Sequence, residues 1–135
     1  AGGPDPSING KLKDIIAKYI EHQKEVIIRR TKFDLEKAEN RVHILEGYKI
    51  AQDNIDEVIA IIKAAKSDVE AKEKLMSRFG LTEIQTDAIL ELKLRRLTGL
   101  EREKIESELA DLLKLIAEYK EILSAFSRKY SREYW

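Results

Sequence analysis

The sequence AILELKLRRLTGLEREKI, residues 88–105, decides how this chain folds. Its first half is rich in leucine and indicates the last turns of a helix that ends near Arg96 and Leu97. Thr98 and Gly99 then predict a break, because glycine accepts the left-handed backbone that closes a helix and threonine can begin the next one. The residues before this break therefore lead out to a tip, and the residues after it return as one long helix.

The return helix and the segment before the tip each carry an apolar seam. Both seams advance by alternating steps of three and four residues, which is the spacing of a coiled coil. The outgoing seam consists of Ile28, Thr31, Leu35, Ala38, Val42 and Leu45, and the returning seam of Ile105, Leu109, Leu112, Ile116, Tyr119 and Leu123. Because a chain that leaves along one seam must come back along the other, we expect an antiparallel pair with Leu45 beside Ile105.

Composition indicates an all-α protein, since about half of the residues are Ala, Glu, Lys, Leu or Arg, as in long helices and coiled coils. The 25 basic and 25 acidic residues give a formal net charge of zero, so there is no overall positive field to hold a polyanion. The absence of cysteine excludes disulfides and thiolate metal sites. No membrane-length apolar run or signal peptide is visible, so we expect a soluble, cytoplasmic protein.

We divide the chain into five segments. Residues 1–10 hold both prolines and are expected to be an irregular leader, compatible with a cloning remnant. Residues 11–53 form the outgoing helix, residues 54–99 a small tip of three short helices, and residues 100–123 the returning helix. Residues 124–135 are rich in aromatic residues and are expected to continue that helix. The predicted fold is therefore a long antiparallel two-helix coiled coil capped by a small helical tip.

Particular residues specify the tip and the tail. Asn54 and Thr82 are candidate helix caps, and Gln85 follows Thr82 at the spacing of a capping box. Gly80 is expected to end a helix. Gly47 costs roughly 1 kcal/mol relative to alanine inside a helix, so it is expected to permit close packing. In the tail, Phe126 and Tyr130 keep the seam spacing. Phe126 is expected near Lys24, and Tyr130 near Tyr19 and Ile20, which the aromatic tail would cover.

The predicted helix over residues 82–97 has apolar residues on more than one face, whereas a helix with one buried side shows a single stripe. It therefore needs cover on two sides. One interpretation is that a second copy of the chain supplies part of that cover, because exposed apolar patches mark association surfaces. The alternative is a core helix that its own chain covers completely.

No catalytic constellation is present in the sequence. His22 and His43 would lie about 30 Å apart on one helix, and no phosphate-binding glycine loop or nucleophile beside a base is visible. We therefore expect no enzyme activity, no catalytic or metal residue and no cofactor. Two basic clusters, at residues 29–32 and 93–96, could contact a phosphate backbone, or pair with the acidic residues that flank them. The possible DNA-facing residues are Arg29, Arg30 and Lys32.

Several motifs occur in an order that resembles one protein family. The chain reads RRT at 29–31, HILEG at 43–47, DNID at 53–56, FGL at 79–81 and RLTGLE at 96–101. Together they resemble the coiled-coil and exit-gate segment of the DNA gyrase A subunits, which are type IIA topoisomerases. The resemblance implies two antiparallel helical arms that end in a small dimerisation domain, through which a transported DNA duplex leaves the ATP-dependent parent enzyme.

The resemblance also implies partners and contacts. We expect a homodimer held by the tip, with gate contacts mostly within residues 80–97; the candidate dimer-interface residues are Leu81, Gln85, Ala88, Ile89, Leu92 and Arg96. In the parent enzyme the expected partners are duplex DNA in transit and the gyrase B subunit, with no membrane and no small-molecule substrate. The competing hypothesis is a generic or engineered coiled-coil homodimerisation scaffold, because the same periodicity predicts both.

Overall fold

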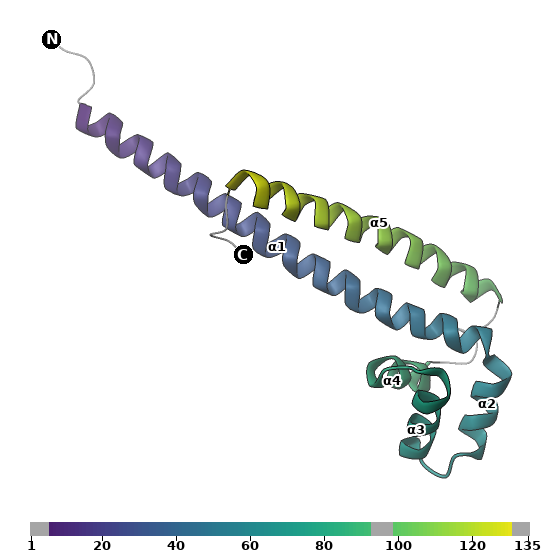
Figure 1. Cartoon of the computed structure of the whole chain (residues 1–135). Helices are drawn as coiled ribbons and strands as arrows, with labels where there is room; N and C mark the ends of the chain where they lie inside the picture. Colours follow the sequence, from purple (N-terminus) through teal and green to yellow (C-terminus); the bar gives the residue numbers. More distant parts are fainter. Residues whose placement is uncertain (1–5, 93–98, 131–135) are drawn as a thin grey trace. The chain divides into compact units, whose positions relative to one another are not determined.

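The computed structural model describes residues 6–92 and 99–130, and every element in this part of the chain is a helix (Figure 1). The helices are α1 (Pro6–Asp53), α2 (Ile55–Ala64), α3 (Asp68–Phe79), α4 (Glu83–Glu91) and α5 (Gly99–Tyr130). The predicted all-α class is therefore confirmed. Helix α1 begins inside the expected irregular leader, because a proline at the first helical position needs no hydrogen-bond partner for its nitrogen.

The short helices begin and end largely as their sequences predict. Gly80 has a φ of 67° and closes α3 in the left-handed conformation, as expected of glycine at this position. Thr82 and Gln85 form the predicted capping box at the start of α4: the Gln85 N–H donates to Thr82 Oγ1 at 3.3 Å, and the Thr82 N–H donates to Gln85 Oε1 at 3.1 Å. Ser67 caps α3 by accepting from the Glu70 N–H.

Asn54 does not cap α2 with its side chain. Its Nδ2 donates instead to the carbonyl oxygen of Ile50 at 3.0 Å, so the side chain satisfies an acceptor in the last turn of α1. Only one residue separates α1 from α2, and the Asn54 side chain bonds to the end of the first helix and to no N–H group of the second.

Helix α4 ends at Glu91, although we expected it to continue to about Leu97. The backbone of Leu92 is extended, with φ −72° and ψ 136°, and its N–H bonds to the carbonyl of Ile89 in a tightened last turn. Leu90 and Leu92 both pack against the core. On a continuous helix, residues two apart would point about 200° apart, so ending the helix here lets both leucines reach apolar cover.

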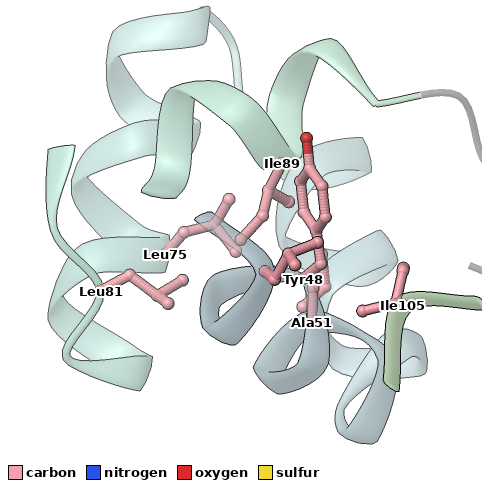
Figure 2. Packing of buried hydrophobic residues seen from close by; sticks show 8 residues of the cluster. Tyr48, Ala51, Leu75, Leu81, Ile89 and Ile105 are labelled. Carbon is pink, nitrogen blue, oxygen red and sulfur yellow. The ribbon is translucent and has the colours of Figure 1, made fainter. Parts of the chain in front are cut away.

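The chain divides into two compact units, one of which comprises residues 36–117. Its core takes side chains from the end of α1, the short helices and the start of α5, as Figure 2 shows for several of them; the buried cluster is Leu45, Tyr48, Ala51, Val58, Leu75, Leu81, Ile89 and Ile105. Leu109 and Leu112 pack against this cluster. Leu45 and Ile105, which we expected to pair, thus belong to one core.

Within this unit, α1 and α5 run antiparallel. Arg41 on α1 pairs with Glu108 on α5 at 2.8 Å, while Asp53, later on α1, pairs with Arg102, earlier on α5. The order of the partners is reversed along the two helices, as an antiparallel pair requires. The hydrogen bond from the Arg41 guanidinium to Glu108 also raises the pKa of Arg41.

The other unit contains residues 6–35 of α1 and 118–130 of α5. The end of α5 lies beside the middle of α1, and the first turns of α1 extend beyond it (Figure 1). The seam residues Ile28, Thr31 and Leu123 are buried there, and Leu35 and Tyr119 are half-buried. The hydroxyl of Thr31 donates to the carbonyl of Ile27 at 2.7 Å, so this buried polar group is satisfied.

Helix α5 continues through the tail to Tyr130, and Phe126 is half-buried. The expected cover over Tyr19 and Ile20 is not found, because these side chains are 63% and 47% exposed. The side chain of Tyr130 lies outside the described residues. No helix in the described ranges, 6–92 and 99–130, is long and apolar enough to cross a membrane.

Candidate functional site

Helix α4, which carries Gln85, Ala88 and Ile89 of the six candidate interface residues, is fixed to α1 by a joint of polar side chains. The Gln85 side-chain amide donates to the carbonyl oxygen of His43 at 2.7 Å, and His43 Nε2 shares a hydrogen bond of 2.6 Å with Thr82 Oγ1. The same threonine and glutamine form the capping box. One pair of residues therefore both begins α4 and sets its position against α1.

Gly47 makes this close approach possible. A Cβ atom at Gly47 would lie 2.9 Å from Cβ and 3.0 Å from Cγ of Gln85, closer than side chains tolerate. The expectation that Gly47 permits close packing is correct, and its packing partner is Gln85.

Ion pairs connect the short helices. Lys72 on α3 lies 2.7 Å from a carboxylate oxygen of Glu83 and 2.9 Å from one of Asp87. The hydrogen bond to Glu83, followed by that to Asp87, raises the pKa of Lys72 above its ordinary value. Arg78 on α3 donates from Nε and Nη2 to the two carboxylate oxygens of Glu57 on α2. The three short helices are thus held to each other by charges on their outer sides.

These helices line an open cavity of about 580 Å³. Its walls are mainly apolar and come from α2, the start of α3 and the end of α4; the apolar residues are Ile55, Val58, Ile59, Ile62, Val69, Ile89, Leu90 and Leu92. Five charged residues complete the lining, namely Lys63, Asp68, Lys72, Asp87 and Glu91. Val69 is 65% exposed and Ile62 is 37% exposed, so the apolar wall continues to the surface.

The structure separates the candidate interface residues into two groups. Leu81, Gln85 and Ile89 are buried in the chain's own fold, where they support the tip from inside. Ala88 and Leu92 are only partly buried and pack against the core. Arg96 lies outside the described residues. A partner could therefore reach Ala88 and Leu92 directly, whereas it would contact the other three only after the fold opened.

The possible DNA-facing residues Arg29, Arg30 and Lys32 are exposed on α1. Arg29 pairs with Glu25, and Arg30 with Asp34 at 3.4 Å, both one turn away on the same helix. His22 is exposed and His43 belongs to the joint with α4. Among residues 6–92 and 99–130, no group of His, Cys, Asp and Glu side chains could hold a metal ion.

Residues 4–134 match the model of one protein family, the A subunits of DNA gyrase and topoisomerase IV. The chain belongs to this family. Three of its relatives are DNA gyrase A subunits from Streptococcus pneumoniae serotype 4, Streptococcus pyogenes serotype M3 and Clostridium acetobutylicum, with identities of 62%, 63% and 62% over 113 residues. Each alignment covers 84% of this chain and 14% of the relative. The chain thus spans about one seventh of the length of these gyrase subunits.

Sequence reasoning missed the part of the apolar surface that α2 and α3 contribute. Ile55, Val58, Ile59 and Ile62 have the spacing of a single apolar stripe, so this pattern gave no signal that one end of the stripe stays open: Val58 is buried, whereas Ile62 is 37% exposed. Val69 gave no signal, because a single valine in the first turn of a polar helix is compatible with either face. Its place beside the cavity follows from the turn at residues 65–67.

Proposed function

We propose that this chain is the dimerisation and exit-gate segment of a gyrase A subunit, with a mechanical role and no catalytic site of its own. The observation that carries the proposal is the apolar surface of the tip, where Leu92, Ile62 and Val69 surround an apolar cavity. A family of bacterial enzymes that pass DNA through themselves needs gates that close by association and open again. An exposed apolar patch on a small helical tip suits that need.

In this proposal the partner at the tip is a second copy of the chain, related by a two-fold axis. The parent enzyme adds the DNA duplex in transit and the gyrase B subunit, and works in the bacterial cytoplasm. The residues that close the gate are Ala88 and Leu92 together with Ile62 and Val69. Leu81, Gln85 and Ile89 act indirectly by holding α4 in place. The scaffold hypothesis has no observation in its favour beyond the helical pairing, which both hypotheses share.

The test compares glutamate at three apolar positions by sedimentation velocity and circular dichroism. Leu92→Glu places a charge on the proposed contact surface and is expected to give a folded monomer. Ile84→Glu is the matched control, since Ile84 is 62% exposed on the same helix but does not line the cavity; it is expected to stay dimeric. Ile89→Glu places a charge in the core, where Ile89 is 4% exposed, and is expected to unfold the tip.

An unchanged dimer for Leu92→Glu and for a second variant, Val69→Glu, would move the interface away from this surface. A wild-type chain that remains monomeric at every concentration measured would remove the dimerisation role altogether.

A further inference from the structure

The apolar cavity at the tip carries opposite charges on its two sides. Helix α3 packs against both α2 and α4, so these two helices form opposite walls (Figure 1). Helix α2 contributes one charged residue to the lining, Lys63, which is exposed. Helix α4 contains no basic residue and contributes two carboxylates to the lining, Asp87 and Glu91. One wall is therefore basic and the other acidic.

Three of the five charges in the lining already have a role within the chain. Lys72 pairs with Asp87 at 2.9 Å, so these two charges neutralise each other. Asp68 is in the first turn of α3, where a negative charge is favourable beside the free N–H groups of the helix. Lys63 and Glu91 remain, and neither makes an ion pair within residues 6–92 and 99–130.

A two-fold axis through the cavity would bring these two charges together. In a symmetric contact, a residue on one side of the patch meets the residue on the opposite side of the second copy, and each such contact occurs twice. The α2 wall of one copy then lies against the α4 wall of the other. The basic wall meets the acidic wall at both places, so the surface is complementary to itself.

We propose that Lys63 of each copy pairs with Glu91 of the other copy when two tips associate. This inference rests on the proposed dimerisation function and adds how the tip recognises a second copy. Ile62 and Leu92, two of the apolar contacts proposed above, directly adjoin Lys63 and Glu91 in the chain. Exposed ion pairs add little attraction, but opposed like charges are unfavourable, so the pairs select the orientation in which the apolar surfaces meet.

The test compares dimer dissociation constants by sedimentation velocity over a dilution series at low salt. Lys63→Glu opposes two carboxylates and Glu91→Lys opposes two ammonium groups. Because each contact occurs twice, either variant alone is expected to raise the Kd about tenfold or more. Lys66→Glu is the matched control, since Lys66 is exposed three residues later but does not line the cavity. Its Kd is expected to change less than about threefold, and high salt should reduce all the differences.

Mixing the Lys63→Glu chain with the Glu91→Lys chain distinguishes a pair between copies from a pair within one chain. In a mixed dimer, one chain carries carboxylates at both positions and the other carries ammonium groups at both, so both contacts become complementary. The equimolar mixture is therefore expected to dimerise with a Kd near that of wild type, although neither variant does so alone. A pair within one chain would not be restored by mixing.

A mixture that associates no more tightly than its components would overturn the proposal. Single variants that dimerise like wild type, while Leu92→Glu is monomeric, would also overturn it and would leave the proposed dimerisation surface intact. A wild-type chain that stays monomeric at every concentration would overturn the ion pair together with the proposed function, since no second copy would be bound.

Discussion

At the scale of single residues, Gly47 decides how closely α4 approaches α1. Glycine weakens a helix because it loses more conformational freedom on folding than any other residue. Here that loss is offset by contact with Gln85, whose side chain occupies the space that a Cβ at position 47 would need. Gln85 then bonds to the carbonyl of His43, one turn earlier on α1. The absence of a Cβ atom at position 47 thus allows α4 to be held in one position against α1.

Gly47→Ala is therefore expected to lower the free energy of unfolding by about 1–3 kcal/mol, as for overpacking, reduced by up to ~1 kcal/mol from better helix propensity. Urea unfolding measures the change. Gly10→Ala is the control, because the same atom added at Gly10 meets nothing within 4 Å on the same helix. It is expected to leave stability unchanged or slightly higher. A Gly47→Ala protein as stable as Gly10→Ala would mean that α4 can move away at no cost.

At the scale of whole elements, α1 has one buried face and one open face along residues 24–35, whereas residues 8–23 are exposed on every face. Ile28 belongs to the buried face and Val26 to the open one. Both side chains are β-branched and aliphatic, so truncating either to alanine removes similar apolar groups from different surroundings. The pair offers a direct measure of how much the seam contributes to stability.

Ile28→Ala is expected to cost about 2–4 kcal/mol, since it leaves a cavity between packed helices. Val26→Ala is expected to change stability by less than ~1 kcal/mol, as for an exposed position. Chemical denaturation at one fixed protein concentration gives both values. Equal costs at the two positions would contradict the assignment of the seam.

The contact between α3 and α4 is expected to depend on pH through Lys72. Its pKa is raised above the ordinary 10.5 in the folded chain, first by Glu83 and then by Asp87, so the protonated form stabilises the fold. This contribution is fully present below about pH 10.5 and is lost as the pH rises through the raised value. The stability advantage of wild type over Lys72→Met should therefore shrink between about pH 9 and pH 12. An advantage that stays constant over this range would exclude the ion pairs as its source.

At the scale of the whole molecule, the zero net charge predicts weak DNA binding. The isolated chain is expected neither to cleave nor to relax a supercoiled plasmid. Its affinity for duplex DNA should be no better than roughly micromolar at physiological salt, the usual range of non-specific contacts. A gel assay with magnesium and a fluorescence titration check the two statements. Magnesium-dependent cleavage, or binding far tighter than micromolar, would be incompatible with a purely mechanical segment.

The sequence was sufficient to predict the all-α class, the end of α3 and the start of α4, because each depends on local spacing or on one residue type. Gly80, Thr82 and Gln85 behave as their chemistry requires. The early end of α4 was not predictable in this way, since leucine favours helix and only tertiary contacts of Leu90 and Leu92 favour the extended backbone.

The candidate site was predictable only in part, for the same reason. Periodicity identifies which apolar residues share one face of a helix. It does not distinguish a face that packs on the chain's own core from a face that packs on a partner. Leu81, Gln85 and Ile89 belong to the first kind, and Leu92 remains partly open. The tail shows the same ambiguity in reverse: we expected it to cover Tyr19 and Ile20, although every residue from 8 to 23 is exposed.

The position of Lys72 between two carboxylates also affects its chemical reactivity. Only a neutral amine can attack an acylating reagent, and a raised pKa leaves less of the Lys72 amine neutral at any pH near 8. Its Nζ is also engaged with Glu83 and Asp87, and 26% of the side chain is exposed. Amine-directed cross-linkers should therefore modify Lys72 more slowly than solvent-exposed lysines such as Lys11 and Lys18. Cross-linking maps of this protein will under-represent the contact between α3 and α4, even though two ion pairs join the helices there.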